Sequence, residues 1–150
     1  MTEPQTSADV VRIERTIPAP PERVFEAWLD PATIAGWLSP TGRARAEVDA
    51  SVGGRFRVVM LGDPGDPVAG DGLVHTGEYL EIDRFRRLVF TWVSPYTGPE
   101  PSRVTVDFEE AGSATRVVLL HEQLPADAVA SHRGGWGAIL DNLVRLLSEA

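Results

Sequence analysis

The stretch that decides the fold is SHRGGWGAILDNLVRLLS, residues Ser131 to Ser148, near the C-terminus. Its apolar side chains recur at steps of three and four residues, the spacing that places them on one face of an α-helix. They are Trp136, Ile139, Leu140, Leu143, Leu146 and Leu147. At about 1.5 Å per residue such a helix is roughly 27 Å long, enough to cross a small domain. The stretch therefore predicts a long helix with one buried face, around which the rest of the chain wraps.

Upstream, the sequence predicts one strand and two short helices. Apolar and polar residues alternate from Val10 to Ile17, which is typical of a strand with one buried face. The PPE sequence at 20–22 favours a helix start, because proline suits the first turn and an acidic side chain complements the positive helix end. Asp30-Pro31 should end that helix, and a second short helix is expected over Thr33 to Leu38.

The middle of the chain predicts six further strands, at Arg43 to Val48, Arg55 to Leu61, Leu73 to Ile82, Leu88 to Val93, Arg103 to Phe108 and Thr115 to Glu122. The loop GDPGDPVAGDG at 62–72 is either a flexible lid or a plain hairpin. Strands joined by short turns pair as an antiparallel meander, and only the terminal helix is long enough to cover its apolar face. We therefore expect an α+β fold in which a curved antiparallel sheet wraps around a long C-terminal helix.

Composition narrows the class of protein. The 150 residues suit a single domain, expected over residues 10–150 with a disordered N-terminus at 1–9. With 14 basic and 22 acidic residues the formal charge is −8, which disfavours nucleic-acid and membrane-surface binding. There are no cysteines, no signal peptide and no apolar run near 20 residues, so we expect a cytoplasmic protein without membrane insertion.

Four segments together resemble a known superfamily. They are RTIPAPPERVFEAWLDPATIAGWL, GEYLEIDRFRRLVFTW, SATRVVLLHEQLP and GGW…LDNLVRLL, and they extend from about Val11 to Leu147. The chain resembles the START-like (SRPBCC) helix-grip superfamily of polyketide cyclases and lipid-transport proteins. More narrowly, it is similar to the bacterial branch named after the C-terminal domain of the Hsp90 ATPase activator.

The resemblance implies a β-α-α-β(6)-α fold with a deep, mostly apolar cavity between the sheet and the helix. Members bind lipids, hormones or polyketides, and a few catalyse cyclisation or hydrolysis in that cavity. Chaperone activators carry a separate N-terminal domain that this sequence does not show, so a chaperone partner is not expected.

Aromatic and apolar residues on the inward positions are candidates to bind a ligand, since ligand pockets are largely apolar with a few polar groups. The candidates are Trp37, Phe56, Val58, Met60, His75, Tyr79, Phe90, Trp92, Val106, Leu119, His121, His132, Trp136 and Leu140. The alternative is that the aromatic side chains simply fill the core.

His121 and Tyr79 are the candidate catalytic pair, because imidazole titrates near neutral pH and alternation places His121 inward. The alternative for His121 is a hydrogen-bonded histidine at the rim of the cavity. The three histidines show no short-spaced pair, so we expect no metal site, and no glycine-rich nucleotide motif points to a cofactor.

Three glycines, Gly134, Gly135 and Gly137, each cost a helix roughly 1 kcal/mol relative to alanine. They either leave room for a ligand or a neighbouring backbone beside Trp136, or they mark a frayed start of the helix. The sequence therefore predicts binding of a small hydrophobic or amphipathic molecule. The alternatives are a cyclase- or hydrolase-like enzyme and a chaperone-binding module, and the edge strand Val10 to Ile17 could pair two subunits weakly.

Overall fold

A computed structural model describes residues 10–62, 72–95, 97 and 100–148. The predicted disordered N-terminus and nearly all of the 62–72 loop lie outside the described residues. Within them, seven strands form one antiparallel sheet in the order β1-β7-β6-β5-β4-β3-β2. The strands are β1 (Val11–Ile17), β2 (Ala44–Val48), β3 (Arg55–Met60), β4 (Leu73–Asp83), β5 (Arg87–Trp92), β6 (Ser102–Ala111) and β7 (Ala114–Glu122).

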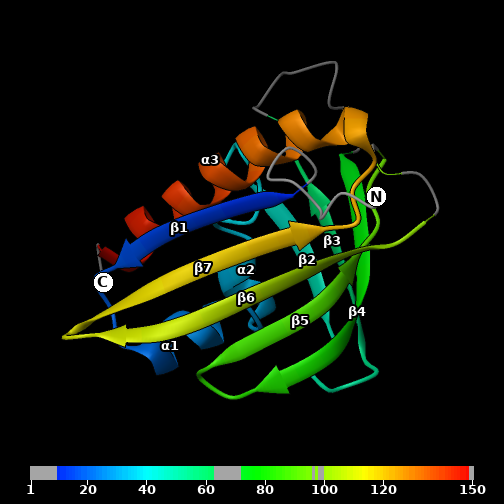
Figure 1. The fold of residues 1–150 in the computed structure, drawn as a ribbon. Helices are drawn as coiled ribbons and strands as arrows, with labels where there is room; N and C mark the ends of the chain where they lie inside the picture. The colour runs from blue at the N-terminus through cyan, green and yellow to red at the C-terminus, as the bar shows by residue number, and fades with distance from the viewer. Residues whose placement is uncertain (1–9, 63–71, 96, 98–99, 149–150) are drawn as a thin grey trace, which may run out of the picture.

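The helices lie where the helix-grip fold requires them. α1 (Pro21–Ala27) and α2 (Pro31–Ile34) follow β1, and a 3-10 turn, η1 (Ala126–Ala128), leads into α3 (Val129–Ser148). The sheet curves, α3 runs beside β1, and α1 and α2 lie behind the central strands (Figure 1). This order of elements confirms the predicted α+β helix-grip architecture.

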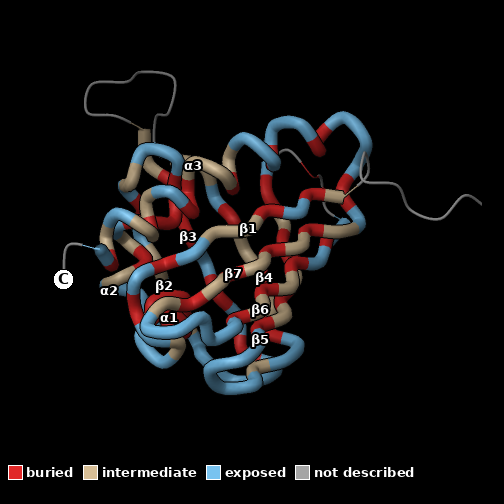
Figure 2. Tube along the Cα trace, turned by 60° about the vertical axis from the view of Figure 1, so that its left-hand side comes forward, coloured by how far each residue is buried: buried red, intermediate tan, exposed pale blue. Residues whose placement is uncertain are grey.

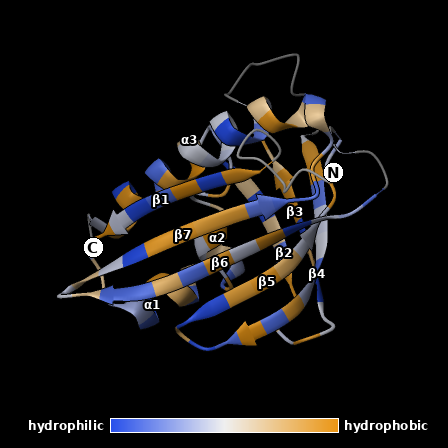
Figure 3. Ribbon diagram, in the orientation of Figure 1, coloured by the Kyte–Doolittle hydropathy of each residue, from blue (hydrophilic) through white to orange (hydrophobic). Residues whose placement is uncertain are grey.

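Alternation along the strands gives the sheet one buried face. Val104, Val106 and Phe108 of β6 are buried, as are Val117 and Leu119 of β7, while the residues between them are more exposed. Figure 2 shows the resulting bands of buried residues, and Figure 3 shows the same alternation in hydropathy. This period-2 pattern is what directs one face of the sheet toward the core.

The second short helix differs from the prediction over Thr33 to Leu38. α2 begins at Pro31, because Asp30 acts as its N-cap and accepts a hydrogen bond from the Thr33 backbone N–H at 3.3 Å, and it ends at Ile34. Asp30-Pro31 therefore starts a helix as well as ending one. The turn after Ile34 carries Trp37 into the core, where its indole donates to the Ala27 carbonyl oxygen at 3.1 Å.

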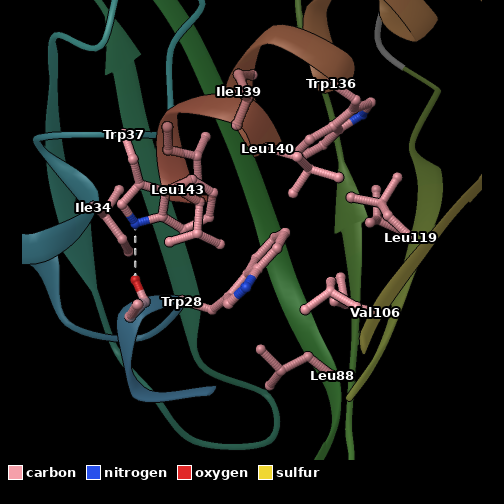
Figure 4. Close-up of a cluster of buried hydrophobic side chains, with 14 of the residues drawn as sticks. Trp28, Ile34, Trp37, Leu88, Val106, Leu119, Trp136, Ile139, Leu140 and Leu143 are labelled. Atoms are coloured by element: carbon pink, nitrogen blue, oxygen red, sulfur yellow. Dashed lines mark hydrogen bonds between the residues drawn. The ribbon is translucent and has the colours of Figure 1, made fainter. Parts of the chain in front are cut away.

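The core lies between the sheet, the two short helices and α3. Trp28 sits at its centre, 4.7 Å from the Trp37 ring and stacked 6.3 Å from the Trp136 ring, measured between centroids. In Figure 4 it lies among side chains from the strands and from α3, namely Leu88, Val106, Leu119, Leu140 and Leu143. Large aromatic side chains thus fill the space that the curved sheet encloses.

The C-terminal half of α3 is fixed to the rest of the domain by polar contacts. Asp141 forms an ion pair with Arg15 of β1 at 2.8 Å, and the Asn142 amide donates to the Ser39 carbonyl oxygen at 2.8 Å. The latter bond places the turn after α2 beside the helix. Among the described helices, none is long and apolar enough to cross a membrane.

Candidate ligand-binding site

A pocket of about 460 Å³ lies between the N-terminal half of α3, strands β3 to β5 and the turn after α2. This volume is within the range typical of sites for small molecules. The described residues that line it are Ser39, Pro40, Thr41, Met60, Leu61, Gly62, Leu73, His75, Trp92, Ser131, His132, Gly135, Trp136 and Ile139. The lining is mostly apolar, with histidines and hydroxyl groups as its polar part.

Five of the sequence candidates meet at this pocket: Met60, His75, Trp92, His132 and Trp136. They come from β3, β4, β5 and α3, so the topology brings together residues that are far apart in the chain. The Trp92 ring lies 5.0 Å from the Trp136 ring and 4.9 Å from the His75 ring. An aromatic wall thus borders the pocket.

Other candidates lie deeper. Phe56, Val58, Tyr79 and Phe90 line a separate void of about 20 Å³, which Trp92 also borders. A void of that size has room for about one water molecule. Trp92 therefore stands between the outer pocket and this inner void.

The remaining candidates line neither of these cavities. They are Trp37, Val106, Leu119, His121 and Leu140, all buried in the core. For these residues the structure agrees with the alternative that inward-facing side chains fill the core.

His121 is fully buried, and both of its ring nitrogens have partners. The Trp136 indole N–H donates to Nδ1 at 2.9 Å, so the proton of the neutral ring is on Nε2. Nε2–H donates to the Ser102 hydroxyl at 2.7 Å, and that hydroxyl donates to the Trp92 carbonyl oxygen at 3.0 Å. Burial lowers the pKa of His121 to about 3. His121 is thus an uncharged group that orients the pocket residue Trp136.

Tyr79 is not close to His121. Its ring packs on Phe56 and Phe90, at 5.4 Å and 6.3 Å between centroids. Burial raises the pKa of the Tyr79 phenol, with the Asp49 carboxylate acting in the same direction. Among the described residues no hydrogen bond or ring contact joins Tyr79 to His121, so the two do not form an acid–base pair in this structure.

His75 and His132 face the pocket from opposite sides, one from β4 and the other from α3. Nδ1 of His75 lies 2.9 Å from the Leu73 carbonyl oxygen, and Nδ1 of His132 lies 2.9 Å from the Ala128 carbonyl oxygen. Burial lowers the pKa of His75 to about 4, and the nearby His132 contributes. Within the described part of the chain, no three His, Asp or Glu side chains are grouped to hold a metal ion.

Several lining residues escaped the sequence analysis. The turn residues Ser39, Pro40 and Thr41 reach the pocket only because Asn142 fixes the turn beside α3, which is a contact between distant parts of the chain. Leu73 and Ile139 could have been predicted from the sequence, because both lie on predicted apolar faces next to residues that were chosen as candidates.

The glycines of α3 lie inside the helix, which begins at Val129, so they do not mark a frayed start. A Cβ added at Gly134 or Gly135 would meet no atom within 4 Å, which also excludes a close neighbouring backbone. Gly135 lines the pocket, whereas Gly134 is exposed. The missing side chain at Gly135 therefore enlarges the pocket.

Solved structures of similar proteins share this architecture. Protein CV1439 from Chromobacterium violaceum is 30% identical, with 93% of this chain and 96% of that chain covered and a TM-score of 0.79. An Hsp90 activator from Plasmodium falciparum is 28% identical, with 93% and 96% covered and a TM-score of 0.73. DynU16, from the dynemicin biosynthetic locus, is 27% identical with a TM-score of 0.74. The alignment covers 93% of this chain and 47% of DynU16.

The family comparison agrees with the structures. A search of proteins with curated functions found no matching sequence. The profile of one family, described as "Activator of Hsp90 ATPase homolog 1-like protein", matches residues 18–148. That match covers most of the chain and confirms the resemblance drawn from its sequence segments. The chain therefore belongs to the family of activator of Hsp90 ATPase homolog 1-like proteins.

Proposed function

We propose that this protein binds a small hydrophobic or amphipathic molecule in the pocket between the sheet and the N-terminal half of α3. The observation that carries the proposal is the pocket of about 460 Å³ beside Trp92 and Trp136. At this pocket a glycine, Gly135, stands in a helix that would be more stable with alanine, and its missing side chain leaves space. An apolar molecule in this space would remove its own surface and the two indole faces from water.

The similarity to DynU16 supports the proposal, because that protein is described as belonging to the dynemicin biosynthetic locus. An enzymatic role has less support from the site, since both nitrogens of His121 are engaged in the core. We therefore assign the pocket to binding.

A pair of adjacent glycines provides the test. Gly135→Phe would place a ring in the pocket, whereas Gly134→Phe would add the same ring to the same helix on its exposed side. The affinity for 2-naphthol is measured by tryptophan fluorescence and calorimetry. We expect the unchanged protein and the Gly134 variant to bind 2-naphthol with similar affinity. Binding to the Gly135 variant should be at least about tenfold weaker, because the ring takes the space of the probe.

Two results would contradict this proposal. The first is equal binding to both glycine variants, provided that thermal unfolding shows both to be folded. The second is the absence of saturable binding to the unchanged protein up to millimolar probe.

Chaperone binding is the second candidate, and it is favoured by the 28% identity to the Plasmodium falciparum Hsp90 activator. It predicts that the protein co-elutes with Hsp90 and changes its ATPase rate. An unchanged ATPase rate in a tenfold excess of this protein, with the Plasmodium activator as positive control, would reject it.

A further inference from the structure

The polar groups of the pocket share one property that narrows the chemistry of its ligand. Nδ1 of both His75 and His132 lies 2.9 Å from a backbone carbonyl oxygen. A carbonyl oxygen can only accept a hydrogen bond, so Nδ1 must carry the proton in each ring. The neutral imidazole then has its lone pair on Nε2. His132 in its neutral form therefore offers a hydrogen-bond acceptor and no free donor, whereas the His75 ring also interacts with the backbone of Val58.

The hydroxyl groups of the pocket show the same pattern. Thr41 donates its proton to the Leu61 carbonyl oxygen at 2.6 Å, and Ser131 donates to the Ala128 carbonyl oxygen at 3.0 Å. Because the Thr41 proton is engaged, the hydroxyl of Ser39, 3.0 Å away, must donate to the Thr41 oxygen. All three hydroxyl protons are thus used within the protein. Lone pairs remain on Ser39 and Ser131, whereas the Thr41 oxygen already accepts from Ser39 and from the Arg43 backbone N–H at 3.2 Å.

Among the described side chains that line the pocket, one N–H group has no hydrogen-bond acceptor within the described protein. The indole N–H of Trp136 donates to His121, whereas the indole N–H of Trp92 is buried without a partner. The described lining contains no Lys, Arg, Asp or Glu, and burial of His75 keeps that ring uncharged at neutral pH. The free polar groups of the described lining are therefore mainly acceptors.

We infer that the ligand of this pocket is an uncharged molecule with an apolar body and a hydroxyl group, which donates a hydrogen bond to the imidazole Nε2 of His132. A hydroxyl group fits because it supplies the proton that these acceptors lack. A carboxylate offers no proton to the acceptors and would lose its hydration in a mostly apolar pocket. The inference rests on the proposed function, because it names the ligand chemistry of the same pocket.

Three probes that share one ring system test the inference at pH 7. 2-Naphthol is uncharged and donates a hydrogen bond, 2-methoxynaphthalene only accepts, and 2-naphthoate is an anion. By calorimetry we expect 2-naphthol to bind about fivefold more tightly than the methoxy compound, as expected for one added hydrogen bond. It should bind at least about tenfold more tightly than the naphthoate, because the anion must be desolvated.

Phenylalanine at two buried positions locates the effect. His132→Phe keeps a ring in the pocket but removes the acceptor, so the preference for 2-naphthol over 2-methoxynaphthalene should fall to about twofold or less. Trp37→Phe is the control, because Trp37 does not line the pocket and its indole N–H donates to Ala27 in the core; this variant should keep the preference of the unchanged protein. Because the two probes are compared on the same variant, a loss of affinity that affects both probes equally does not change the preference.

The outcomes separate the two proposals. Equal binding of 2-naphthol and 2-methoxynaphthalene to the unchanged protein, or tighter binding of 2-naphthoate, would overturn the inference and leave the binding function intact. A preference that His132→Phe preserves would also overturn it. Failure of every probe to bind would overturn the binding function and the inference together.

Discussion

At the scale of single residues, the four tryptophans differ in what their indole N–H groups contact. Trp37 donates to the Ala27 carbonyl oxygen and Trp136 donates to His121. The N–H groups of Trp28 and Trp92 are buried without a partner. A buried donor that lacks a partner costs free energy that a paired donor does not. Similar rings therefore contribute differently to stability.

This difference predicts the effect of the same substitution at two sites. Trp28→Phe and Trp37→Phe remove equal volume from one core, but only Trp37→Phe breaks a hydrogen bond and leaves the Ala27 carbonyl oxygen unpaired. Trp37→Phe should lower the free energy of unfolding by about 1–3 kcal/mol more than Trp28→Phe. Urea denaturation of both variants measures the difference, and an equal or reversed order would show that the hydrogen bond has no such role.

At the scale of helices and strands, two glycines occupy opposite environments. Gly134 is exposed in α3, and an added Cβ would contact nothing within 4 Å. Gly77 lies in β4 opposite Phe56 of β3, and an added Cβ would overlap the Thr91 carbonyl oxygen and lie 2.5 Å from the Phe56 ring. Gly77 allows this aromatic ring to pack on the strand, whereas Gly134 only weakens its helix.

Alanine should therefore have opposite effects at these two positions. Gly134→Ala should raise the free energy of unfolding by about 0.5–1 kcal/mol, because alanine has the higher helix propensity. Gly77→Ala should lower it by about 1–3 kcal/mol or more, because the added methyl group overpacks the core. Chemical denaturation measures both. A destabilised Gly134 variant or a neutral Gly77 variant would contradict the respective packing.

The elements themselves were largely predictable from the sequence, because alternation and helical spacing are local signals. β1, β6, β7 and α3 lie where the pattern placed them. The α2 prediction was wrong at both ends: the helix begins at Pro31 because Asp30 caps it, and it ends at Ile34, where we expected it to continue to Leu38. In the pocket, five residues on inward faces were predicted, whereas Leu73 and Ile139 on such faces were missed. The Ser39–Thr41 turn was also missed, since a bond between positions 39 and 142 has no local signal.

At the scale of the whole molecule, buried histidines make stability depend on pH. Burial lowers the pKa of His75 to about 4 and that of His121 to about 3, from an ordinary value of 6.5. Between about pH 6.5 and 4 the unfolded chain therefore binds more protons than the folded protein. Stability should be complete above this window and should fall as the pH decreases through it.

Each of the two histidines should contribute a slope of about 1.4 kcal/mol per pH unit within that window. Denaturant unfolding at several values between pH 7.5 and 4.5 measures the slope. The slope of the free energy of unfolding against pH should be smaller in the His75→Phe variant and in the His121→Phe variant, in each case by the contribution of the missing histidine. A flat profile over this range would mean that the two rings are not held neutral by the fold.

The central claim is that a ligand occupies the pocket beside Trp92 and Trp136, and the indole N–H signals in ¹H–¹⁵N NMR spectra test it most directly. Each of the four tryptophans gives one signal, which Trp→Phe variants assign. On titration with 2-naphthol, we predict saturable shifts of the Trp92 and Trp136 signals, because both rings line the pocket. The Trp37 signal should stay in place, because that N–H is bonded to Ala27 in the core. Unmoved Trp92 and Trp136 signals, or equal shifts of all four, would contradict a ligand site in this pocket.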